Sequence, residues 1–132
     1  MELYSSNFCT IEFEPSTLIL KQVWSSGTAN MTNDDFVSEQ TKLASFFESS
    51  KPKKIHSDAR EAAFVIAPDL QEWNAKEILS VFAKNGGVKC AILIPPDIFA
   101  QVSIQQSLEE AAGDFITRYF EDEKELVAWL NG

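Results

Sequence analysis

The side chains best suited to binding or catalysis gather after three short runs that have the composition of β-strands. Trp24 ends the first run, Asp58 ends the second with Arg60 two residues later, and Pro95 and Asp97 follow the third. Ligands of parallel sheets bind outside the carboxyl ends of the strands, so these five are candidate ligand-binding residues. A guanidinium there suits a carboxylate or phosphate. The alternative is that Arg60 only pairs with a neighbouring acid to hold its loop.

Three tryptophans and ten phenylalanines are a generous aromatic content for 132 residues. Aromatic side chains dominate protein cores, and core filling is one interpretation of them here. The other is an aromatic-lined pocket for an apolar ligand or lipid, with Trp73, Phe82 and Phe99 as its walls. Trp73 is therefore a sixth candidate ligand-binding residue.

Residues that would support catalysis or metal binding do not form a recognisable motif. His56 is the only histidine, and it should not meet Ser57 as base and nucleophile, because adjacent strand residues point to opposite faces. Cys9 and Cys90 fit no metal spacing and are interpreted as buried small hydrophobes. We therefore predict no catalytic residue, no metal site, no cofactor and no enzymatic activity.

The composition is that of a single globular domain spanning residues 1–132. The chain is 45% hydrophobic and 23% charged, with a formal net charge of −9. That charge would repel nucleic acid and anionic membrane surfaces. No apolar run approaches the roughly 20 residues that cross a bilayer, and the first residues lack the pattern of a secretory signal. We expect a cytoplasmic protein without stable membrane insertion.

The first two elements form a hairpin. Residues 8–14 are predicted to be a strand, because apolar and polar side chains alternate from Cys9 to Phe13 as they do in a half-buried strand. Pro15 and Ser16 separate them from a second strand over residues 17–24, which predicts an antiparallel pair. An unpaired edge of this hairpin is a template for association, so a homodimer is one expectation.

Helices and strands alternate after the hairpin. Thr32 and Asp35 have capping-box spacing at the start of a helix that runs to about residue 48. A strand over residues 53–58 precedes a helix that starts at Pro68 and stops at Gly86 and Gly87. The apolar run over residues 88–94 predicts a central strand buried on both faces.

Three further elements complete the chain. Ser103 and Gln106 have the spacing of another capping box and predict a short helix that stops at Gly113. A strand over residues 115–120 and a final helix capped by Asp122 follow. The order β-β-α-β-α-β-α-β-α predicts an α/β fold: a mixed, mostly parallel sheet with an N-terminal antiparallel hairpin and about four helices.

Several local sequences occur in an order that resembles the SpoIIAA-like branch of the STAS superfamily. They are the hairpin that ends near Trp24, the acidic helix start after Met31, and the stretches 70–73, 91–95, 119–123 and 128–130. The resemblance implies a small cytosolic α/β domain without established enzymatic chemistry. Among similar proteins, bacterial anti-sigma factor antagonists bind a kinase and are switched by serine phosphorylation. Others sense ligands, and a SEC14-like label implies an apolar ligand.

The chain departs from the antagonists at their phosphorylation motif. They carry Asp-Ser-Ser or Asp-Ser-Thr in the turn after the third strand, whereas here Ser57 precedes Asp58 and is expected inside a strand. We therefore assign no phosphorylation site. The sequence predicts a non-enzymatic STAS-like module that binds a protein partner or a small apolar or anionic ligand. The alternative is a small carrier or sensor of an apolar ligand or lipid.

Overall fold

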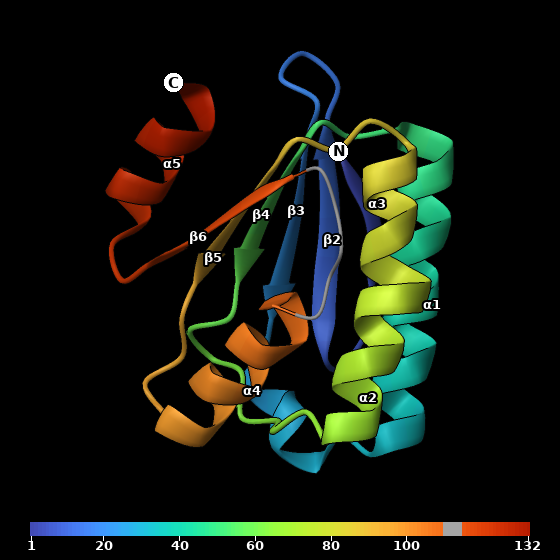
Figure 1. Cartoon of the computed structure of the whole chain (residues 1–132), viewed down its shortest axis with the longest axis vertical. Coiled ribbons are helices and arrows are strands. Elements are labelled where there is room, and N and C mark those ends of the chain that lie inside the picture. The colour runs from blue at the N-terminus through green and yellow to red at the C-terminus, as the bar shows by residue number, and fades with distance from the viewer. Residues whose placement is uncertain (110–114) are drawn as a thin grey trace.

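The computed structural model describes residues 1–109 and 115–132 and contains one six-stranded mixed sheet (Figure 1). The strands lie in chain order across the sheet, from β1 to β6. The first three pair antiparallel, and β3 to β6 are parallel. Their bounds are β1 (Glu2–Ser5), β2 (Cys9–Glu14), β3 (Ile19–Trp24), β4 (Lys54–Asp58), β5 (Lys89–Leu93) and β6 (Ile116–Phe120). The predicted α/β class and hairpin are confirmed.

Helices cover both faces of the sheet and one of its ends (Figure 1). One face carries α1 and the continuous helix formed by α2, the π-helical turn η2 and α3, whereas α5 lies on the other. The helix α4 lies beyond the ends of β3 and β4. The bounds are η1 (Ser26–Asn30), α1 (Asn33–Ser50), α2 (Pro68–Trp73), η2 (Asn74–Leu79), α3 (Ser80–Lys84), α4 (Ile98–Glu109) and α5 (Glu123–Asn131).

The strand β1 was not predicted. It has only four residues and no periodic burial pattern, and it forms by pairing antiparallel with β2, with Tyr4 opposite Ile11. Its presence corrects the prediction that the hairpin forms the edge of the sheet, because β1 covers that edge. A homodimer built on pairing at this edge would therefore use β1 in place of β2.

The predicted start of α4 was wrong. The helix begins at Ile98, and Asp97 Oδ1 accepts hydrogen bonds from the backbone N–H groups of Phe99 and Ala100, at 2.8 and 3.1 Å. Ser103 lies inside the helix and accepts a hydrogen bond from the Ile66 N–H at 3.1 Å. Both Asp97 and Ser103 are of cap-forming types, so local composition alone did not decide between them. The predicted stop at Gly113 lies outside the described residues.

The start of α1 is the capping box expected from the sequence. The Asp35 N–H donates to Thr32 Oγ1 at 3.1 Å, and the Thr32 N–H donates to Asp35 Oδ2 at 2.9 Å. Met31 and Phe36, on either side of the cap, belong to the same buried cluster. This cap sets the rotation of α1, so that the helix presents Phe36, Gln40 and Leu43 to the interior.

The core has two layers, one on each face of the sheet. Cys90 and Ile92 of β5 belong to the layer under α1 and α3, while Ala91 and Leu93 belong to the layer under α5. The prediction that this strand is buried on both faces is confirmed. Cys9 and Cys90 are free and buried, as expected. In the described ranges, no helix is long and apolar enough to cross a membrane.

Candidate functional site

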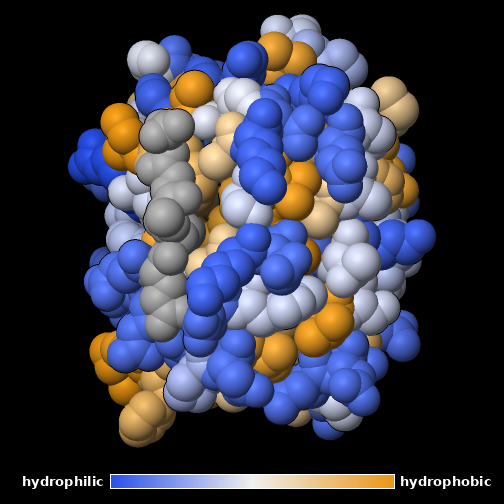
Figure 2. All heavy atoms as spheres, turned by 45° about the vertical axis from the view of Figure 1, so that its right-hand side comes forward, coloured by the Kyte–Doolittle hydropathy of each residue, from blue (hydrophilic) through white to orange (hydrophobic). Residues whose placement is uncertain are grey.

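A cavity of about 90 Å³ lies between the sheet and the helical layer of α1 and η2. Its floor comes from β3, β4 and β5, and extends from Ile55 and Cys90 near the strand starts to Trp24 at the end of β3. The helix α4 contributes Ile104, Ser107 and Leu108 to its wall. Hydrophilic side chains cover most of the outer face of this helical layer, with small separate apolar areas among them (Figure 2). At one end the cavity reaches Trp24 and Ala59, at the carboxyl ends of β3 and β4, which is where ligands of parallel sheets bind.

Aromatic rings form one wall of the cavity. Trp24, Phe36 and Phe64 all line it, and their rings stack in series, with centroids 6.4 Å apart for the first pair and 5.3 Å for the second. Trp73 meets the Phe36 ring edge-on at 6.3 Å, so it supports this wall from behind. The remaining lining is mostly aliphatic, and no described lining residue is charged.

A chain of buried polar side chains crosses the cavity from the sheet to α4. Gln22 Nε2 donates to Gln40 Oε1 at 3.2 Å, Gln40 Nε2 donates to Asn74 Oδ1 at 3.0 Å, and Asn74 Nδ2 donates to Ser107 Oγ at 3.1 Å. All four side chains line the cavity and are buried. Every bond runs in the same direction, so each group polarises the next. These four side chains, which we call the amide chain, connect β3, α1, η2 and α4.

These polar lining residues were not among the sequence candidates. Two of them leave a signal in the sequence: Gln22 falls on the apolar side of its strand, and Gln40 falls among the apolar positions of its helix. A polar residue at a buried position needs a partner, which is a reason to examine it. Asn74 begins a π-helical turn, a feature that often occurs at functional sites.

The six candidate residues do not form one site. Trp24 lines the cavity, and Trp73 supports its wall. Pro95 is fully buried and its carbonyl accepts a hydrogen bond from Gln101 Nε2 at 2.7 Å, while Asp97 caps α4. Asp58 and Arg60 belong to an ionic cluster described below.

The predicted pocket between Trp73, Phe82 and Phe99 is not formed. Phe82 is fully buried between Phe47 and Phe115, with ring centroids at 5.3 and 5.2 Å, and Phe99 is 72% exposed on α4. The cavity uses other aromatic residues. Helical spacing assigned Phe82 correctly to an apolar face, but it could not reveal that Phe47 of α1 and Phe115, just before β6, close over that face.

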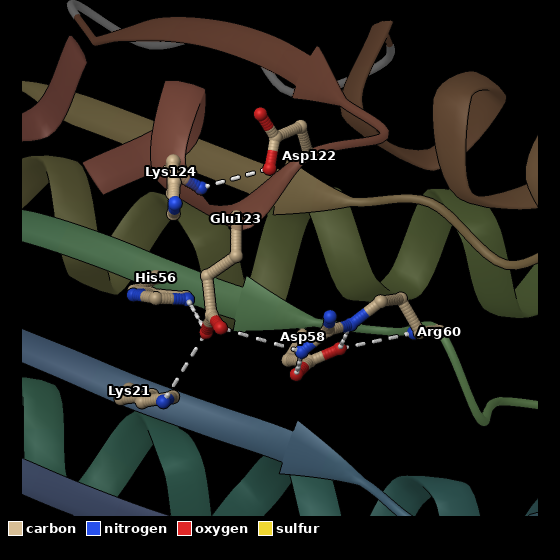
Figure 3. A network of polar contacts seen from close by, with 7 residues as sticks. All are labelled: Lys21, His56, Asp58, Arg60, Asp122, Glu123 and Lys124. Carbon is tan, nitrogen blue, oxygen red and sulfur yellow. Dashed lines mark hydrogen bonds and ion pairs between the residues drawn. The ribbon is translucent and has the colours of Figure 1, made fainter. Parts of the chain in front are cut away.

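Asp58 and Arg60 lie on the opposite side of the sheet, at the start of α5 (Figure 3). Arg60 donates from Nε to Asp58 Oδ1 at 3.0 Å and from Nη2 to Asp58 Oδ2 at 2.6 Å, a bidentate pair. Burial would raise the pKa of Asp58, but the hydrogen bonds and charge of Arg60 outweigh it and leave that pKa below its ordinary value. Arg60 thus binds the neighbouring acid, which was the alternative to ligand binding.

Glu123, the first residue of α5, completes this ionic cluster (Figure 3). Its carboxylate lies 3.7 Å from Lys21 Nζ, His56 Nε2 and Arg60 Nη2. His56 is 8% exposed at its side chain, and Nε2 has no hydrogen-bond partner among the described residues. Ser57 lines the cavity on the other face. The prediction that His56 and Ser57 point to opposite faces is confirmed.

We expect acid to destabilise the fold through His56. Burial, and next the charge of Lys21, lower the pKa of His56 against the opposing influence of Glu123 and Asp58. The unfolded chain has a histidine pKa of about 6.5. Between that pH and the lower pKa of the folded chain, the unfolded chain therefore binds more protons than the folded one. The stability contributed by neutral His56 is present above pH 6.5 and is lost as pH falls towards the lowered folded value.

Urea denaturation between pH 7.5 and pH 5.5 tests this expectation. Since His56 is the only histidine, the variant His56→Phe should lose most of the decrease in unfolding free energy that the parent chain shows. An equal decrease in both proteins would contradict the assignment.

The fold and the cavity together define an α/β protein with an internal cavity whose described lining carries no charged side chain. Comparison of the chain with models of protein families, with curated proteins and with solved structures returned no match.

Proposed function

We propose that this chain is a ligand-binding module of the STAS type that acts without catalysis, and that its ligand occupies the cavity. The observation that carries the proposal is the cavity itself: a mostly apolar space that reaches the carboxyl ends of parallel strands and is crossed by a few convergent polar groups. Ligand sites generally have this make-up. The STAS type is proposed from the order of local sequences given above, and the α/β class with a mixed sheet agrees with the fold that this resemblance implies.

The groups around the cavity favour binding over catalysis. Cys90 is the one cysteine in the described lining, and burial raises the pKa of its thiol to about 12, so the thiol is protonated at neutral pH. A thiol is a nucleophile only as the thiolate. His56, the only histidine, lies on the opposite face of the sheet, in contact with Glu123.

The size of the cavity favours a small ligand over a lipid. Drug-sized ligands occupy about 300–1,000 Å³, and an engineered cavity that holds benzene measures about 150 Å³. The cavity here, at about 90 Å³, is smaller than either. A module that senses a small molecule therefore fits better than a lipid carrier, which would need the helices to separate.

The amide chain offers a way for ligand binding to affect the surface. It links the cavity floor on β3 to α4 through direct hydrogen bonds, so a ligand that displaces one member changes the partners of the others. Recognition of the occupied state by a protein partner is part of this proposal.

A fragment screen followed by nuclear magnetic resonance (NMR) tests the proposal. We expect uncharged fragments to shift the side-chain NH₂ signals of Gln22, Gln40 and Asn74 and the indole signal of Trp24. The variant Ala62→Leu fills the cavity from its lining and should abolish these shifts. The matched control is Ala63→Leu, one residue along the chain at an exposed position outside the lining, which should leave them unchanged.

Two outcomes would overturn the proposal. One is the failure of every fragment to move the signals of the lining residues. The other is equal binding by Ala62→Leu and the parent chain, which would place the bound fragment elsewhere.

A further inference from the structure

Two polar groups lie side by side on the floor of the cavity. Gln22 of β3 and Ser57 of β4 are register partners across the parallel strand pair, and both line the cavity. Neighbouring strands are about 4.8 Å apart. A single functional group of a small molecule can therefore contact both side chains at once.

The hydrogen bonds of Gln22 leave its carbonyl oxygen available. Both of its bonds use Nε2, which donates to Gln40 Oε1 at 3.2 Å and to Cys9 Sγ at 3.7 Å. Within residues 1–109 and 115–132, no group donates to Gln22 Oε1, and the Ser57 hydroxyl makes no hydrogen bond. Gln22 thus stands at the head of the amide chain with an unused acceptor, beside a hydroxyl that can donate or accept.

The surroundings of this pair are apolar. In the next strand, Ile92 is the register partner of Ser57, and Ile55, Leu43 and Cys90 also line the cavity. A polar group in such surroundings costs free energy unless it is hydrogen-bonded. A ligand that forms hydrogen bonds with both Gln22 and Ser57 therefore gains most of its specificity from these two residues.

We infer that the cavity binds a small neutral amide, whose N–H donates to Gln22 Oε1 and whose carbonyl oxygen accepts from the Ser57 hydroxyl. This inference rests on the proposed function and names the chemistry of its ligand. The cavity is smaller than one that holds benzene, so the ligand has no more than about six non-hydrogen atoms. Its remaining atoms are aliphatic, to match the lining.

A carboxylate does not fit the same place. Among the described lining residues none is charged, so a buried anion would have no counterion. Its oxygens would also face the acceptor Gln22 Oε1. The cationic groups Lys21 and Arg60 lie on the other face of the sheet, around Glu123. The expectation of an anionic ligand is therefore not extended to this cavity.

Three probes of one shape test the inference. Isobutyramide, 3-methyl-2-butanone and isobutyrate share a branched skeleton. The amide carries an N–H donor, the ketone carries neither a donor nor a charge, and isobutyrate carries a negative charge. We expect isobutyramide to bind at least tenfold more tightly than the ketone at pH 7, with isobutyrate showing no saturable binding. NMR titration of the side-chain amide signals measures each dissociation constant.

Two variants assign the recognition to the two residues. Gln22→Met removes Oε1 with little change of shape. In this variant the affinities for isobutyramide and for the ketone should differ by no more than about twofold. Because this variant also removes the donor to Gln40, Ser57→Ala serves as a second variant that leaves the amide chain intact. It should weaken the amide severalfold while preserving its preference over the ketone. Arg60→Ala, on the opposite face, should change neither affinity.

The outcomes separate this inference from the proposed function. Equal binding of amide and ketone by the parent chain, or tight binding of isobutyrate, overturns the assigned chemistry but leaves a ligand-binding cavity. Failure of all three probes, while other fragments bind and are blocked by Ala62→Leu, also overturns the inference alone. If no fragment of any kind binds in the cavity, both the inference and the proposed function are contradicted.

Discussion

Replacing Phe82 with alanine is expected to lower the free energy of unfolding by about 3–5 kcal/mol. The ring is fully buried and packs against Phe47 and Phe115, at centroid distances of 5.3 and 5.2 Å. A Cβ at Gly87 would come within 2.4 Å of the same ring, so the backbone closes tightly over it. Loss of the ring leaves a void among aromatic and backbone atoms that have little room to collapse.

Urea denaturation followed by circular dichroism measures this effect. The matched control is Phe99→Ala on α4, where the ring is 72% exposed and its loss should change the unfolding free energy by no more than about 0.5 kcal/mol. Similar losses at both positions would contradict the assigned burial.

Replacing Gln40 with leucine is expected to cost about 2–4 kcal/mol, although leucine suits a helix and a buried position. Gln40 stands in the middle of the amide chain, accepting from Gln22 Nε2 and donating to Asn74 Oδ1. Leucine can do neither, so two buried polar groups lose a partner, at about 1–3 kcal/mol each. The apolar gain of the leucine side chain offsets part of this cost.

The control for this second variant is Glu48→Leu, an exposed position on the same helix, expected to stay within about 0.5 kcal/mol of the parent chain. In addition, the side-chain NH₂ signals of Gln22 and Asn74 should shift in Gln40→Leu and not in Glu48→Leu. A stability equal to that of the parent chain would show that the amide chain contributes nothing, and would weaken the case for its role in ligand binding.

Local patterns predicted most of the secondary structure and some side-chain directions. Alternation defined the hairpin strands, and the capping box at Thr32 and Asp35 defined the start of α1. The rule that adjacent strand residues face opposite ways separated His56 from Ser57. These features depend on residues close together in the chain, whose preferences act before any tertiary contact forms.

The short edge strand β1 and the ionic cluster around Glu123 could not be predicted locally, because both depend on contacts with distant parts of the chain. Residues 2–5 are a strand because β2 offers them hydrogen bonds, with Glu2 opposite Glu12. Arg60 could be expected to meet Asp58, two residues away, but the approach of Glu123 depends on how α5 returns across the sheet.

The site is the part that only the tertiary structure decided. The sequence prediction pointed to the ends of parallel strands and included Trp24, which lines the cavity. The amide chain, however, joins residues far apart in sequence on four elements. No local preference brings such residues together. Composition and periodicity determine which face of each element is apolar, whereas a cavity and its polar contacts exist only once those faces have packed, because both are properties of the space between elements.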